Sequence, residues 1–76
     1  MDNIEFGSVS LKLEEQMKKQ NISINKLAFR AEMERTQLKQ YIHNDMQRVD
    51  LSVLARLCYA LNCDINDILE YKKPNK

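Results

Sequence analysis

Polar side chains follow one another along the outer face of a predicted helix in the middle of the chain. Counted at 100° per residue from Leu38, the outward positions carry hydroxyl, amide and imidazole groups, and a lysine lies on one flank. Hydroxyl and amide groups can hydrogen-bond the edges of DNA bases, whereas a cationic side chain can contact phosphate. The pattern predicts a DNA-recognition surface, with ordinary solvated surface as the alternative. Its residues are Thr36, Gln37, Gln40, His43 and Asn44, flanked by Lys39.

Two short helices joined by a tight turn are needed to present this surface. Apolar residues recur with i, i+3, i+4 spacing over residues 24–31 and again over residues 38–42. Because only a few residues, Glu32 to Arg35, lie between the two predicted helices, the helices must cross at a steep angle, and the small Ala28 permits their close approach. We therefore predict a helix-turn-helix within residues 22–44. Ser23 is the expected N-cap of its first helix, and its second helix is expected from 34–36 to 44–45.

The segment before this motif predicts one more helix. It is expected from about Ser8 or Ser10 to Gln20, because a serine can cap the free amides and Asn21 suits a left-handed terminator. The single glycine separates this helix from a short arm over residues 1–7, which could be frayed, fold over the core or add a strand to a partner. The residues expected to face the core are Val9, Leu13 and Met17.

The segment after the motif predicts two further helices. After a linker over residues 46–49, Asp50 is expected to cap a helix over residues 51–61, and Asp64 is expected to cap a short fifth helix. The core-facing residues are expected to be Leu51, Leu54, Leu57, Cys58 and Leu61 in the first of these helices, and Ile65, Ile68 and Leu69 in the second.

The composition predicts a single all-α domain. Seventy-six residues allow one small core, and the chain has 43% apolar residues but only one glycine and one proline. Few helix breakers and no alternating β-branched runs favour a fold of five short helices. We expect the domain over residues 8–71, after the arm over 1–7 and before a basic tail over 72–76.

The net charge does not by itself indicate a nucleic-acid partner. The chain has 12 basic and 11 acidic side chains, which gives a net charge of +1. The charges between residues 32 and 48 also cancel. DNA binding would therefore depend on where the basic side chains lie and not on their total.

The two cysteines indicate free thiols and no metal or redox site. Cys58 and Cys63 lie five residues apart, unlike a CxxC motif, and no histidine is near them in the sequence. Cys58 shares a helical face with leucines, so we expect a buried thiol in a reducing compartment. The chain shows no signal peptide and no apolar run of about 20 residues. We expect a cytoplasmic protein with no membrane span, metal or cofactor.

Three motifs in the expected order resemble the Cro/C1-type (phage-repressor, XRE-like) helix-turn-helix family, in particular its very small single-domain bacterial transcriptional regulators. They read ISxxxLA at residues 22–28, RTQL at 35–38 and LxxLxxLCxALxCxxxDILEY at 51–71. The last motif is the most specific, and the resemblance covers Leu13 to Tyr71. It implies a compact five-helix, lambda-repressor-like DNA-binding domain with the helix-turn-helix at helices 2 and 3.

The resemblance implies that the third helix lies in the major groove of double-stranded DNA and that a homodimer binds a pseudo-palindromic operator. The base-reading positions fall on Arg35, Thr36 and Gln40, with Gln37 in reach. Their chemistry suits this role, because arginine matches the two acceptors of guanine and glutamine can bond the donor and acceptor of adenine.

Contacts to the DNA backbone fall on a second set of residues. The resemblance places them on Ser23, at the start of the second helix, and on His43 and Asn44, after the reading helix. Lys39 and Arg48 suit phosphates by their charge, and such contacts fix the register without reading sequence. An idle surface histidine is the alternative for His43.

Three positions depart from the family pattern. Glu32 stands where the turn usually has glycine, Glu34 replaces a Ser or Thr cap, and Ile24 replaces a glutamine that contacts phosphate. A left-handed residue with a Cβ costs about 1 kcal/mol, so Glu32 should strain the turn. The resemblance also implies an activation surface at Glu32 and Glu34, because activators of this family contact RNA polymerase near this turn. Plain solvation is the alternative.

Other assignments stay open. Tyr41 is expected to pack in the core, with base stacking as the alternative, and Tyr71 is a candidate dimer contact. The alternative function is an antitoxin or protein-binding adaptor on the same fold. An enzyme is disfavoured, because the sequence offers no histidine-centred triad and no glycine-rich phosphate loop.

Overall fold

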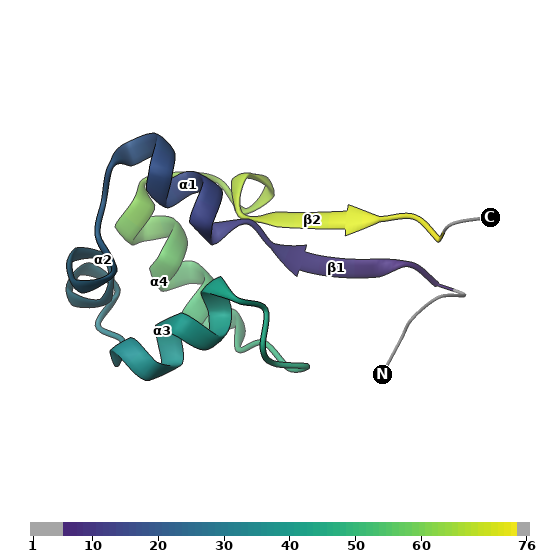
Figure 1. Cartoon of the computed structure of the whole chain (residues 1–76), viewed down its shortest axis with the longest axis horizontal. Coiled ribbons are helices and arrows are strands. Elements are labelled where there is room, and N and C mark those ends of the chain that lie inside the picture. Colours follow the sequence, from purple (N-terminus) through teal and green to yellow (C-terminus); the bar gives the residue numbers. More distant parts are fainter. Residues whose placement is uncertain (1–5, 75–76) are drawn as a thin grey trace.

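The computed structural model describes residues 6–74 and shows four short α-helices joined to a two-stranded antiparallel sheet (Figure 1). The helices pack together, and the two strands extend away from them to one side, so that the described part of the chain begins and ends at the far end of the sheet. In chain order the elements are β1 (Ser8–Leu11), α1 (Leu13–Gln20), α2 (Ile24–Ala31), α3 (Arg35–Ile42), α4 (Leu51–Leu61), the 3₁₀ turn η1 (Ile65–Asp67) and β2 (Leu69–Lys72).

Helices α2 and α4 form where the local signals predict them, whereas α3 begins as expected but ends at Ile42, before the predicted 44–45. The Ser23 hydroxyl accepts a hydrogen bond from the Lys26 amide at 3.1 Å and caps α2. The Asp50 carboxylate accepts one from the Ser52 amide at 2.9 Å and caps α4. Helices α1, α2 and α4 each end in a left-handed residue, and the terminator predicted at Asn21 is confirmed.

The core draws residues from every helix. α2 packs against both α3 and α4, and Ile68 closes the core beyond η1. Tyr41 is buried, which confirms core packing over base stacking. Cys58 and Cys63 are free thiols, but they are half-buried and not fully buried as predicted for Cys58. Burial raises the pKa of both thiols. The largest fully buried side chains are Leu13, Leu27, Leu38, Leu57, Leu61 and Ile68.

The predicted all-α, five-helix fold is wrong at both ends of the described chain. The segment from Ser8 is a strand and not the start of a helix, and α1 begins at Leu13 without a side-chain cap. The predicted fifth helix is only the single 3₁₀ turn η1, and Leu69 already belongs to β2. The serines before α1 and the short apolar run after Asp64 carry helix-like signals, but each strand satisfies its backbone with the other.

Three predicted core residues are exposed instead. Val9 is 65% exposed because β1 carries it away from the helices, and Leu51 is 79% exposed on the first turn of α4. Ile65 is also largely exposed. The arm predicted over residues 1–7 lies mainly outside the described residues, as do positions 75–76 of the tail, while Lys72 is the last residue of β2.

One side chain links the sheet to the segment after α3, and one glycine precedes the first strand. The Asn44 amide oxygen accepts from the Leu11 amide at 2.6 Å, and its nitrogen donates to the Leu11 carbonyl at 3.1 Å. Asn44 follows α3 and has φ 59°, so its backbone is turned to aim the side chain at β1. Gly7 has φ 85°, and a Cβ at this position would collide with the carbonyl oxygen of Lys72.

Candidate nucleic-acid interface

A sharp turn sets α3 across α2. Glu32 takes the left-handed conformation with φ 55°, and its amide donates to the Phe29 carbonyl at 3.3 Å. The Met33 amide donates to the Ala28 carbonyl at 2.9 Å, and the Met33 side chain is buried. This pattern satisfies the last carbonyls of α2 while the chain reverses. Glu34 then precedes α3 as an N-cap residue without a side-chain cap bond.

The turn leaves one face of α3 directed outward. Leu38, Tyr41 and Ile42 are buried and fix the helix on the core. The predicted base-reading residues lie on or beside the opposite face: Arg35, Thr36 and Gln40 are exposed, and Gln37 is half-buried. Lys39 and His43 are exposed as well. The face therefore offers hydrogen-bond donors and acceptors to solvent along two turns of helix.

A contact that the sequence did not predict holds Arg35 in place. Its guanidinium nitrogen donates to the side-chain oxygen of Asn25 at 3.0 Å. Asn25 lies in the first turn of α2, directly after the cap region, and is exposed. The bond joins the two helices at their solvent side and leaves the other guanidinium donors of Arg35 available. The pairing depends on how α2 and α3 cross, so sequence spacing alone could not reveal it.

Two other predicted backbone-contacting residues are exposed. Ser23 lies directly before α2, and Arg48 lies in the loop before α4. Asn44 stands apart from the predicted backbone-contacting set. Both polar ends of its side chain are engaged by the backbone of Leu11. Its side chain therefore has a structural part in joining the segment after α3 to β1, while Asn44 itself is exposed next to His43 and its contact with the DNA backbone stays a prediction.

These helices carry the signature of a known family. The sequence matches the Cro/C1-type HTH DNA-binding domain over residues 12–74. The chain belongs to the Cro/C1-type helix-turn-helix family.

A solved structure shares the fold of this Cro/C1-type domain. The restriction-modification controller protein C.AhdI from Aeromonas hydrophila superposes with a TM-score of 0.67 at 21% sequence identity. The match covers 74% of this chain and 83% of the controller protein. No curated protein sequence matches the chain. Family membership makes this protein a small helical DNA-binding regulator, in which α2 and α3 are joined by the tight turn.

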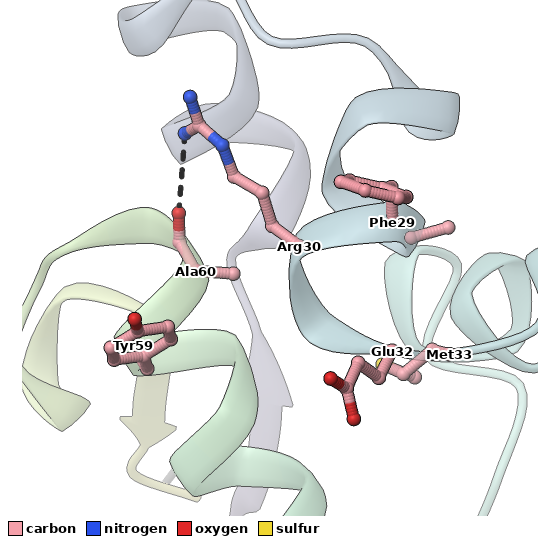
Figure 2. A pocket seen from close by; sticks show the side chains of 7 residues that line it. Phe29, Arg30, Glu32, Met33, Tyr59 and Ala60 are labelled. Carbon is pink, nitrogen blue, oxygen red and sulfur yellow. Dashed lines mark hydrogen bonds between the residues drawn. The ribbon is translucent and has the colours of Figure 1, made fainter.

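The Cro/C1-type domain also has an aromatic groove beside the turn (Figure 2). Phe29 on α2 and Tyr59 on α4 flank it, and each is 83% exposed. Between them, the Arg30 guanidinium reaches the carbonyl oxygen of Ala60 at 3.5 Å and links the two helices. Glu32 lines the same groove, so one of the two acidic residues at the turn faces this side of the domain.

Among residues 6–74, no helix is both long and apolar enough to cross a membrane; the longest, α4, has 11 residues. Tyr71, the candidate dimer contact, lies on β2 and is 57% exposed. Its hydroxyl donates to the Phe6 carbonyl at 2.7 Å and holds the entry of β1 beside β2.

Proposed function

We propose that this protein is a sequence-specific transcription regulator that reads the major groove with α3 and binds a pseudo-palindromic operator as a homodimer. The supporting observation is the exposed polar face of α3, held across α2 by the left-handed turn at Glu32. Family membership supports the same role, since Cro/C1-type domains bind DNA. With no membrane-spanning helix among the described residues, we keep the cytoplasm as the expected location.

In this proposal α3 contacts bases with its first two turns. Arg35 is the guanine reader, because its fork of donors matches the two acceptors of that base. Gln40 suits adenine, and Thr36 can bond a base edge or touch a thymine methyl group. Gln37 is half-buried and contributes from the side of the helix. Asn25 acts as a positioning residue, because its bond to Arg35 restricts the guanidinium before DNA arrives.

Phosphate contacts surround these base readers. Lys39 and Arg48 supply positive charge, while Ser23 and His43 supply hydrogen-bonding groups near the ends of α2 and α3. Such contacts release counterions, so the affinity should fall with salt with a log–log slope of about −0.9 for each neutralised phosphate. The near-neutral net charge of +1 gives little general attraction to DNA, so binding to random DNA at physiological salt should be weak.

Selection of bound duplexes from a random DNA library, at near-physiological salt, tests the proposal. An enriched inverted repeat with half-sites about one helical turn apart is the expected result. A single enriched half-site would indicate a monomer on DNA, and no enrichment would contradict the reading role of α3.

Three alanine variants then separate the assigned roles. Arg35→Ala should relax specificity at one base pair in each half-site, at a cost of roughly 1–3 kcal/mol for the preferred sequence. Asn25→Ala should relax the same base pair to a smaller degree. Lys39→Ala is the matched control, because loss of a phosphate contact weakens all sequences alike. Unchanged operator preference in Arg35→Ala would show that the reading face is misassigned.

A protein-binding adaptor or antitoxin is the second candidate, and the aromatic groove favours it. Phe29 and Tyr59 are large side chains that a lone DNA-binding domain does not need to expose.

RNA polymerase is the partner expected if the protein is an activator, with Glu32 and Glu34 as the contact surface. Phe29→Ser with Tyr59→Ser should leave operator affinity unchanged while abolishing co-purification of a partner or activation of transcription in vitro. Loss of operator binding in this variant would place the groove in DNA recognition instead.

A further inference from the structure

The two cysteines of the chain meet at the C-terminal end of α4. Asn62 takes the left-handed conformation with φ 50° directly after the helix, and its amide donates to the Tyr59 carbonyl at 3.2 Å. The Cys63 amide donates to the Cys58 carbonyl at 3.0 Å. Together these bonds form a Schellman motif, in which the residues at these last two positions commonly make an apolar contact. Here both positions hold a thiol.

The geometry of this helix end suits a disulfide, although the five-residue separation of the cysteines predicts no redox motif. A disulfide needs Cα atoms about 4.4–6.8 Å apart and Cβ atoms that face each other. The direct backbone bond between Cys58 and Cys63 brings their Cα atoms close. A hydrogen bond between the two thiols shows that the side chains face each other. Bridging them therefore needs little movement of the backbone.

Both thiols are within reach of a small oxidant. Cys58 and Cys63 are half-buried at the edge of the core and are not sealed inside it. They are the only two cysteines in the sequence, so no other thiol of the same chain competes for either of them. Disulfides in a reducing compartment are usually transient and often sense oxidants. A pair that is close, accessible and reduced fits such a role.

We propose that Cys58 and Cys63 form an oxidative modification site, at which hydrogen peroxide closes a disulfide across the end of α4. The Cys58 thiolate first attacks peroxide, so that an S–O bond forms, the O–O bond breaks and the departing hydroxide takes up a proton as water. The Cys63 sulfur then attacks the sulfenic acid of Cys58, forming the S–S bond and releasing a second water. Two thiols are oxidised, and one peroxide is reduced to two waters.

The surroundings of the thiols set the order and the speed of these steps. Burial raises the pKa of both thiols, and the carboxylates of Asp64 and Asp67 raise it further. A hydrogen bond from the Cys63 thiol partly offsets this rise at Cys58, which is therefore the first to ionise. Because the thiolate is the reacting form, the oxidation is slow at neutral pH. A thiol of high pKa also leaves slowly, so the finished bridge is reduced slowly and records sustained oxidation.

The bridge would fasten a helix end that two other helices contact. The Leu61 carbonyl accepts from the Gln20 side chain of α1 at 2.7 Å. The Ala60 carbonyl accepts from the Arg30 guanidinium of α2 at 3.5 Å (Figure 2). A domain with one small core has modest stability, and a disulfide restricts the unfolded chain. Oxidation should therefore stabilise the folded domain.

Peroxide treatment of the purified full chain tests the bridge. After treatment and blocking of free thiols with iodoacetamide, the intact mass should be lower than that of the untreated chain by two hydrogen atoms, with no thiol blocked. Dithiothreitol should restore both thiols. Cys58→Ser and Cys63→Ser are matched controls, because each keeps one thiol and cannot close the bridge within a chain. If the treated chain still offers two thiols, or forms disulfides only between chains, the proposal is wrong and the pair is an apolar helix-end contact.

Urea unfolding of the oxidised and reduced chains tests the effect on stability. Oxidation should lower the unfolded fraction about tenfold at a given urea concentration, because the bridge removes freedom from the unfolded chain. The chain also has four methionines that peroxide can oxidise, so C58S/C63S treated in the same way is the control and should gain no stability. An oxidised chain no more stable than the reduced one would overturn the stabilising role. Neither measurement involves DNA, so failure of the proposed reading role of α3 would leave this inference intact.

Discussion

Replacing Glu32 by glycine should stabilise the domain, because this residue occupies a conformation that suits glycine. Four non-glycine residues of the described chain have positive φ, and the other three are asparagines. Asparagine enters the left-handed region several-fold more often than most residues do, whereas glutamate has no local side-chain bond to compensate. Glu32, with φ 55°, is therefore the position in this group with the largest strain.

The expected gain follows from two opposing terms. The left-handed conformation costs about 1–2 kcal/mol for a residue with a Cβ, and glycine removes this cost. Glycine also has greater backbone freedom in the unfolded chain, which lowers the free energy of unfolding by about 0.5–1 kcal/mol. The difference spans roughly 0–1.5 kcal/mol and centres on about 0.8 kcal/mol, which corresponds to a rise in melting temperature of roughly 3–6 °C for a domain of this size.

Thermal and urea unfolding followed by circular dichroism measure the gain, and two variants serve as controls. Glu32→Ala removes the carboxylate but keeps the Cβ, so it should not stabilise the domain. Asn62→Gly changes another left-handed position at which the original residue is already well suited, so its gain should be smaller. If Glu32→Gly is no more stable than Glu32→Ala, backbone strain does not reside at this turn and the reasoning fails.

Three further changes probe other parts of the fold. Asn44→Gly keeps the left-handed backbone but removes both side-chain bonds to Leu11. The free energy of unfolding in urea should fall by about 1–3 kcal/mol. An unchanged urea midpoint would show that these two bonds do not stabilise the domain. Gly7→Ala should push the two strands apart, because the added Cβ would collide with the carbonyl oxygen of Lys72 in β2. Faster hydrogen exchange of the β1 backbone amides is the expected result. The pKa of Asp50 is lowered by hydrogen bonds from the Ser52 hydroxyl and amide. Its contribution to the free energy of unfolding should therefore be complete above the unfolded pKa of about 3.9 and be lost as the pH falls through the lower folded pKa. Asp50→Ala should remove this part of the pH dependence. Urea unfolding at several acidic pH values measures the difference.

The middle of the fold was predictable because its signals are local. Ser23 and Asp50 are strong caps directly before apolar-periodic segments, and α2 and α4 begin where these caps place them. The burial of Tyr41 followed from its spacing to Leu38 on one helical face. The exposed face of α3 followed from the same periodicity.

The strands were not predictable from local signals. Ser8 to Leu11 and Leu69 to Lys72 are each only four residues long, too short for their alternation to stand out. Each segment is a strand because the other lies beside it, and they come from opposite ends of the chain. A serine before an apolar run is an equally good helix cap in isolation, so local propensity favoured the wrong element.

The candidate site was predictable as a surface but not as a set of contacts. The exposure of Arg35 and Gln40 followed from helical geometry, while the bond from Asn25 to Arg35 depends on the crossing of two helices. Asn44 has the residue type expected of a phosphate contact. Its side chain is instead used by a strand whose existence the sequence did not indicate.

The pairing of Ser8 with Lys72 brings together residues that are almost the full chain apart, and this has a consequence for folding. The helices and their turns involve neighbours in sequence and can form early, whereas the sheet must wait until the helical body has brought its two ends together. A circular permutant that joins the present ends and opens the chain between α3 and α4 would convert the sheet into a local hairpin. It should fold faster and form its strands before its helices have packed.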